Sequence, residues 1–180
     1  MKDVVFITGN QSKADYLATL IDHPIDHIKM DIDEIQSLDL HDVVKHKLHQ
    51  AYLEVERPVL VEDVALEFSA LGRLPGTLIK WFLQELSNED LCRLVDGKSR
   101  DATALCVFGY YDGQTETYFE SALRGQIPEH PAGEGGYGWD SIFIPEGYTC
   151  TRAELSCKDD EETYMKIKPI AQVRDFLLAE

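Results

Sequence analysis

The chain has 180 residues, of which 44% are hydrophobic, and it carries 33 acidic against 17 basic side chains, a formal net charge of −16. This length and composition suit one domain with a sizeable core, over residues 1–180. The negative charge argues against nucleic-acid binding, which depends on Lys and Arg neutralising phosphates. Neither a membrane-spanning run of about 18 apolar residues nor a basic leader with a cleavage site occurs. We therefore expect a cytoplasmic protein with no membrane partner.

The four cysteines show no metal-binding or redox spacing. They are Cys92, Cys106, Cys150 and Cys157, and they form no CxxC pair. We expect reduced thiols with mostly structural roles, because disulfides are rare in cytoplasmic proteins.

The first segment predicts a strand, a turn and a helix. Residues 4–7 form an apolar run, and apolar residues at helical spacing recur over residues 14–21. Between them, Thr8-Gly9-Asn10-Gln11-Ser12-Lys13 offers backbone N–H groups, neutral side-chain donors and one mobile positive charge to an anion. Such a turn can hold a phosphate, and Gly9 lets the backbone approach it. A plain turn with a capping Asn10 or Ser12 explains the hexapeptide equally well.

Acidic residues follow two predicted strands. Residues 28–35 alternate apolar and polar positions and predict a half-exposed strand that carries Glu34 near its end. Residues 58–61 predict a buried strand that ends at Glu62 and Asp63. Carboxylates at the ends of neighbouring strands can hold Mg²⁺, and one of them can deprotonate a water molecule. A solvated acidic edge is the alternative, above all for Glu34.

Three lysines could meet phosphates beside this acidic centre. They are Lys13, Lys47, on a helix predicted to begin near Asp39 or Asp42, and Lys80, which has apolar neighbours on both sides. A surface lysine that buries only its methylene stem is an equally good interpretation of Lys80.

The second half predicts a hairpin and a glycine-rich loop. Residues 102–111 and 115–122 are two strands joined by Asp112-Gly113, and residues 124–147 form a structured loop around a short strand at residues 141–144. Within it, Gly135-Gly136-Tyr137-Gly138-Trp139-Asp140 could bring an aromatic ring against a flat ligand. Aromatic side chains that plug the core are the alternative.

Four segments resemble, in order and spacing, motifs of the inosine triphosphate pyrophosphatase family. Residues 8–13 are similar to its TGNxxK motif, and residues 61–66 to (V/A)-(E/D)-D-(T/S)-x-L. Residues 74–82 resemble LPGxYIKWF, and residues 136–143 resemble GFG(W/Y)DPxF. Four motifs in register, over nearly the whole chain, are far more specific than any one of them.

This resemblance implies an α/β fold, with a long twisted mixed sheet flanked by helices and two lobes around a deep nucleotide cleft, as a homodimer. It implies Mg²⁺-dependent hydrolysis of a nucleoside triphosphate, a non-standard or modified purine such as ITP or XTP, to the monophosphate and pyrophosphate. The residues expected to hold the phosphates are Thr8, Gly9, Asn10, Lys13, Lys47 and Lys80. Those expected at the base and sugar are Tyr137, Gly138, Trp139 and Asp140, and Lys166 is a further residue expected to contact the substrate. Glu34 and Asp63 would bind the metal, with Asp63 as the base for the water and Glu62 in support.

The C-terminal segment departs from the family pattern ELSxxEKNxxSHRxxAL. The lysine position is Asp160, and the Ser-His-Arg triplet is Tyr164-Met165-Lys166, so Lys166 stands where the motif has arginine. Pro169 favours a broken or shifted helix here. We expect a weaker or redirected preference for keto purines, with Asp160 favouring a hydrogen-bond donor on the ligand. A nucleotide-binding homologue with lost or redirected activity, or the same chemistry on another specialised nucleotide, stays open.

Overall fold

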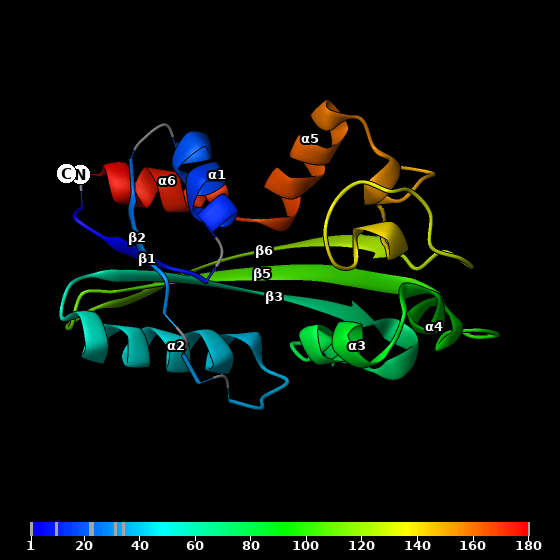
Figure 1. Ribbon diagram of the computed structural model, residues 1–180, viewed down its shortest axis with the longest axis horizontal. Helices are drawn as coiled ribbons and strands as arrows, with labels where there is room; N and C mark the ends of the chain where they lie inside the picture. Colours follow the sequence, from blue (N-terminus) through cyan, green and yellow to red (C-terminus); the bar gives the residue numbers. More distant parts are fainter. Residues whose placement is uncertain (1, 10, 22–23, 31, 34, 180) are drawn as a thin grey trace. The chain divides into compact units, whose positions relative to one another are not determined.

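The computed structural model describes residues 2–9, 11–21, 24–30, 32–33 and 35–179 (Figure 1). Its strands form one mixed seven-stranded sheet in the order β2-β1-β3-β5-β6-β7, with β4 paired to β3. The strands are β1 (Val5–Ile7), β2 (Asp26–Ile28), β3 (Val59–Phe68), β4 (Pro75–Gly76), β5 (Asp101–Tyr111), β6 (Glu116–Gln126) and β7 (Ile144–Pro145). The α-helices are α1 (Gln11–Ile21), α2 (Leu40–Val55), α3 (Ile79–Glu85), α4 (Asn88–Arg93), α5 (Cys157–Ile167) and α6 (Ile170–Leu178). Three 3-10 helices are η1 (Ser69–Leu71), η2 (Asp140–Ile142) and η3 (Arg152–Glu154). The expected α/β fold with helices flanking a mixed sheet is confirmed.

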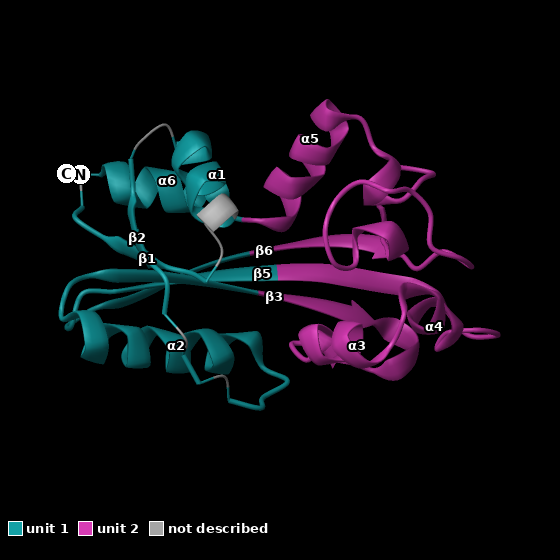
Figure 2. Ribbon diagram, in the orientation of Figure 1, with its two compact units in different colours: residues 1–63, 106–120, 169–180 teal, residues 64–105, 121–168 magenta. Residues whose placement is uncertain are grey.

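The chain divides into two compact units (Figure 2). Unit 1 comprises residues 1–63, 106–120 and 169–180, and unit 2 comprises residues 64–105 and 121–168. The ranges of β3, β5 and β6 cross these boundaries, so each of the three strands belongs in part to both units.

Unit 1 is built on the parallel strands β2, β1 and β3. β1 pairs in parallel with both neighbours, which requires crossover connections, and α1 and α2 supply them. In unit 1, α1 and α6 cover one face of these strands and α2 covers the other (Figure 1). α2 packs closely because β5 carries Gly109, where a Cβ would lie 2.6 Å from side-chain atoms of Val44 and Leu48. The buried rings of Phe6 and Phe108 stack 6.2 Å apart in the core.

Unit 2 holds α3 and α4 on one side of its strands and α5 on the other (Figure 1). α4 begins with a capping box, in which the Ser87 hydroxyl accepts from the backbone N–H of Asp90 and the Asp90 carboxylate accepts in return. α5 ends at Ile167 because Lys168, which precedes a proline, adopts extended backbone angles of φ −109 and ψ 131. The helix break expected at Pro169 is therefore present, but Tyr164-Met165-Lys166 stay on α5.

Four predicted element boundaries are wrong. The second strand of the hairpin, β6, continues to Gln126, whereas the sequence predicts that it ends at residue 122 and that a loop begins at residue 124. The edge strand β2 spans Asp26–Ile28, whereas the alternation predicts residues 28–35. Residues 141–144 form the end of η2 and the start of β7 rather than one strand. Most consequential for the site, β3 continues from Val59 to Phe68, so Glu62 and Asp63 lie inside the strand and not after it.

Candidate functional site

The turn between β1 and α1 occupies the predicted position. β1 ends at Ile7 and α1 begins at Gln11, and the backbone N–H of Thr8 donates to the carbonyl of Ile28 at 3.2 Å. Gly9 is exposed, and no protein atom lies within 4 Å of where its Cβ would be. The protein's own packing therefore does not require this glycine, which is consistent with a ligand-facing role. Asn10 lies outside the described residues.

Two adjacent carboxylates of β3 pair with lysines from two different helices. The Glu62 Oε1 atom lies 3.5 Å from the Nζ of Lys13 on α1, and the Asp63 Oδ2 atom accepts from the Nζ of Lys47 on α2 at 2.7 Å. Successive side chains of a strand point to opposite faces, and α1 and α2 cover opposite faces in unit 1 (Figure 1). The sequence suggests one acidic cluster, whereas the structure directs Glu62 to the α1 face and Asp63 to the α2 face.

The two pairs differ in burial. The Glu62 side chain is 4% exposed and Lys13 is 38% exposed, whereas Asp63 and Lys47 are 21% and 14% exposed. A nearly buried carboxylate requires a partner, so the Glu62 carboxylate depends on its ion pair with Lys13. The Asp63 carboxylate is more exposed and stays accessible to solvent and to a ligand. A lysine ammonium on its flexible stem can turn from a carboxylate to an arriving phosphate. Lys13 and Lys47 can therefore exchange their carboxylate partners for the phosphates of an anionic ligand.

The donor set near Asp63 is compatible with Mg²⁺ held jointly with a ligand. Among the residues that the structure describes, no group of three or more His, Cys, Asp or Glu side chains is placed to hold a metal ion. Glu34, the other expected ligand, lies outside the described residues. Mg²⁺ is commonly bound by one or two carboxylates together with substrate phosphates, so the hard oxygens of Asp63 fit this type of site.

Lys80 and Lys166 lie on unit 2 helices. Lys80 on α3 is exposed, with its Nζ 5.6 Å from the Trp81 ring, which is itself 50% exposed. Lys166 on α5 donates to Glu162 at 2.7 Å, and this hydrogen bond raises the pKa of Lys166. The Lys166 ammonium is therefore occupied by a neighbour on its own helix.

The predicted aromatic turn splits its two rings between solvent and protein. Tyr137 is 84% exposed, and its backbone N–H donates to Asp140 Oδ2 at 2.7 Å. Trp139 is half-buried and meets the Phe143 ring edge-on, with centroids 5.5 Å apart. Gly138 has a positive φ of 64 that favours glycine, and its carbonyl accepts from the Asn88 amide. Tyr137 thus offers a ring to a ligand, while Trp139 packs against protein.

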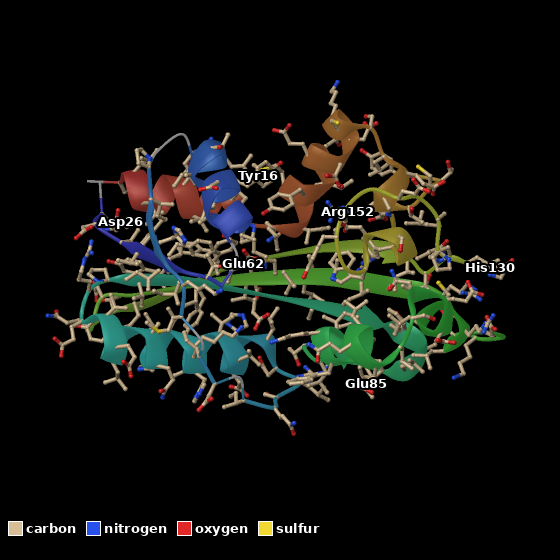
Figure 3. The ribbon with its side chains drawn as sticks, in the orientation of Figure 1. Tyr16, Asp26, Glu62, Glu85, His130 and Arg152 are labelled. Atoms are coloured by element: carbon tan, nitrogen blue, oxygen red, sulfur yellow. The ribbon has the colours of Figure 1, made fainter. Side chains whose placement is uncertain are left out.

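Arg152 is a site residue that the sequence interpretation does not include (Figure 3). Its side chain is 8% exposed, and it donates to Asp140 at 2.9 Å, to Asp160 at 2.5 Å and to the Thr163 hydroxyl at 3.2 Å. The guanidinium also lies 6.0 Å from the Trp139 ring centroid. The donor that Asp160 meets within the protein is therefore Arg152. The sequence signal that could have identified Arg152 is its position eight residues before Asp160, the acid that stands where the family motif has lysine.

Burial raises the pKa of Asp140. The burial effect is opposed by the positive charge of Arg152 and by the hydrogen bond from the backbone of Tyr137, and it is reinforced by the nearby charge of Asp160. Lys168 also lowers this pKa. Among these groups, Arg152 most strongly favours the ionised form of the buried Asp140 carboxylate.

Sequence comparison now decides the family. The Ham1 family model matches residues 4–176. The chain belongs to the Ham1 family. Inosine triphosphate pyrophosphatase 2 of Trypanosoma cruzi is 41% identical over 174 residues, covering 94% of this chain and 87% of the relative. The inosine triphosphate pyrophosphatase of Yarrowia lipolytica is 36% identical over 180 residues, covering 97% of this chain and 95% of the relative.

Solved structures share the Ham1 fold. A HAM1 protein from Coxiella burnetii superposes with a TM-score of 0.84 at 22% identity, covering 98% of both chains. A nucleoside-triphosphatase, or dITP/XTP pyrophosphatase, from Mycobacterium abscessus gives a TM-score of 0.79 at 18% identity, covering 94% of this chain and 97% of the other. In the described part of this Ham1 chain, no helix is long and apolar enough to cross a membrane.

Proposed function

We propose that the chain hydrolyses nucleoside triphosphates to the monophosphate and pyrophosphate, with a non-standard or modified purine such as ITP or XTP as substrate. The observation that carries this proposal is the pairing of Lys13 and Lys47 with the two adjacent acids of β3, Glu62 and Asp63. The relatives named inosine triphosphate pyrophosphatases, at 41% and 36% identity, support the choice of reaction.

The reaction adds water to the α-phosphorus and breaks the bond from that phosphorus to the oxygen that bridges to the β-phosphate. Asp63 is the proposed base: its partly exposed carboxylate takes a proton from the water as the new P–O bond forms. Lys13 and Lys47 turn from their carboxylates to the phosphates, which they approach from the two faces of β3 beyond Leu60, the last residue of β3 that pairs with β1. Thr8, Gly9, Asn10 and Lys80 complete the phosphate contacts. Pyrophosphate leaves with the bridging oxygen, and positive side chains stabilise the charge that it carries away.

Mg²⁺ is part of the proposal. Asp63, together with Glu34, would hold the ion, which supplies charge neutralisation at the phosphates when it is bound. The net charge of −16 supports this requirement, because a triphosphate approaching so acidic a protein needs local positive charge.

A nucleotide-binding homologue with redirected activity is the second candidate. It is favoured by Tyr164-Met165-Lys166, where the motif has Ser-His-Arg, and by Lys166, whose ammonium is bound to Glu162. We also propose that residues 1–180 act as a single domain around a nucleotide cleft, as a cytoplasmic homodimer, without nucleic-acid or membrane partners.

A pyrophosphate-release assay tests the function. ITP, XTP, ATP, GTP and pyrimidine triphosphates are each incubated with the chain, with Mg²⁺ or with excess chelator. We expect the monophosphate and pyrophosphate in equal amounts from at least one triphosphate, and loss of activity with chelator. Orthophosphate as the released product would contradict the proposed bond cleavage. Binding without turnover of any triphosphate would favour the second candidate.

A further inference from the structure

A continuous series of polar contacts in unit 2 connects α5 to the turn at residues 136–140. Asp160 on α5 accepts from Arg152, which donates also to Asp140 Oδ1, while Asp140 Oδ2 accepts from the backbone N–H of Tyr137. The series ends at the backbone of Tyr137, whose ring is exposed. Arg152 is its central member, because among the residues that the structure describes it is the one that donates to both carboxylates.

The same arginine fixes the second aromatic ring of the turn. Its guanidinium lies over Trp139, and Phe143 meets that ring edge-on at an interplanar angle of 86°. Close packing around Asp140 leaves the turn little freedom, since a Cβ at Gly136 would lie 2.5 Å from Asp140 Oδ2. The Trp139 ring is thus held in place between Arg152 and Phe143, whereas the exposed Tyr137 ring is accessible for stacking.

A buried ionic contact of this kind is weak evidence for a stabilising role. Well-packed apolar side chains of similar volume commonly stabilise a protein as well as a buried ion pair does, because burying charges carries a desolvation cost. Arg152 nevertheless engages two carboxylates on two elements, which fixes geometry more strongly than it adds stability. Its contact with the Trp139 ring, and its link through Asp140 to the backbone of Tyr137, indicate that the turn is what is being fixed.

We propose that Arg152 is a positioning residue for nucleobase recognition, holding the turn at residues 136–140 so that Tyr137 stacks on a purine. This inference rests on the proposed nucleotide function. Arg152 acts through Asp140 and Trp139 and takes no part in the chemical step. Its loss should weaken nucleotide binding and leave turnover of bound substrate nearly unchanged.

The test compares Arg152→Met with Arg100→Met. Arg100 is a matched structural arginine of unit 2, which donates to Asp96 at 2.6 Å and to the carbonyls of Cys92 and Pro128. For ITP hydrolysis, we expect Arg152→Met to raise KM about tenfold or more at nearly constant kcat, as lost uniform binding does. Arg100→Met should lower the melting temperature without changing KM. Equal KM values for both variants and the wild type would overturn the inference.

Ligand binding gives a readout without turnover. Trp81 and Trp139 are the two tryptophans of the chain, so in a Trp81→Phe background the emission reports Trp139 alone. Titration with inosine monophosphate should change this emission in the parent and require higher concentrations after Arg152→Met. Arg152→Lys should recover part of the affinity, since lysine can pair with one carboxylate but lacks the planar fork. Unchanged affinity in Arg152→Met would contradict the positioning role, and so would an affinity in Arg152→Lys no higher than that of Arg152→Met.

Two further outcomes separate the inference from the proposed function. A wild-type chain that releases pyrophosphate from no triphosphate refutes the function, whereas active wild type with unaltered KM in Arg152→Met refutes only the inference. If Arg152→Met fails to fold, Asp160→Asn replaces it, because it removes the negative charge of one half-exposed partner of Arg152. We expect a smaller rise in KM in the same direction, and an unchanged KM would overturn the inference.

Discussion

At the scale of single residues, the environment of Asp63 distinguishes it from the glutamate beside it. Asp63 is partly exposed and paired with Lys47, whereas Glu62 is nearly buried against Lys13 on the other face of β3. Because the chain alternates between faces, the two carboxylates cannot both approach one water molecule from the same side. The proposed base is therefore a single carboxylate, with Glu62 acting through Lys13.

We expect Asp63→Asn to lower kcat by about 10²- to 10⁴-fold, the usual cost of losing a general base. The amide keeps the shape of the side chain, so the melting temperature should change little. Glu116→Gln is the matched control: Glu116 is another partly buried strand carboxylate that pairs with α2, through His49 at 2.7 Å. Steady-state kinetics of both variants check the assignment, and near wild-type turnover by Asp63→Asn would refute it.

The Arg152 contacts predict a pH-dependent stability. Since the pKa of Asp140 is raised on folding, the folded state binds more protons than the unfolded state above the ordinary carboxyl pKa, and stability falls as pH rises through the folded value. Arg152→Met removes the cation that opposes this rise, so the loss should deepen. Thermal unfolding at pH 5 and pH 8 measures it: the melting-temperature deficit of Arg152→Met should be larger at pH 8. An equal deficit at both values would contradict the role assigned to Arg152.

At the scale of elements, α5 carries Asp160 and Lys166, and its start is fixed by one cap. The Ser156 hydroxyl accepts from the backbone N–H of Asp159. Ser156→Ala should lower the free energy of unfolding by about 0.5–2 kcal/mol, the usual value for a lost N-cap. Urea denaturation measures this change. Ser99→Ala, whose hydroxyl lies outside any helix cap, provides the comparison, and equal stability of the two variants would show that the cap contributes little.

Local patterns predict the elements that short-range chemistry determines. Asp112-Gly113 correctly indicates the β5–β6 hairpin, where the Asp112 carboxylate accepts from the backbone N–H groups of Gln114 and Thr115. Of the two acids expected near the start of α2, Asp39 is the N-cap and Asp42 lies in the first turn. The end of β3 is misplaced because acids have low strand propensity, whereas the lysines that compensate them come from distant helices. Arg152 is missed for a similar reason: its pairing with Asp140 forms only in the folded chain, and the sequence shows no more than its spacing of eight residues from Asp160.

At the scale of the whole molecule, the fold supports the resemblance that four sequence motifs establish. Cys92 and Cys106 are buried, and burial raises the pKa of the Cys92 thiol to about 11, which suits an unreactive structural thiol, whereas Cys157 is exposed. The chain carries 33 acidic against 17 basic side chains, and the two acids that pair with Lys13 and Lys47 are a small part of this negative charge. The individual ion pairs therefore indicate where an anionic ligand can bind, whereas the net charge of the molecule does not.

The alternation of Glu62 and Asp63 between two faces also restricts how such a site can evolve. Which acid meets Lys13 and which meets Lys47 depends on the parity of the residue count along β3. Inserting or deleting one residue between Val59 and Val61 would exchange the two acids and turn the apolar positions of the strand outward. Point substitutions can adjust the chemistry of this strand step by step, whereas any change in its length by an odd number of residues loses the site and the core together.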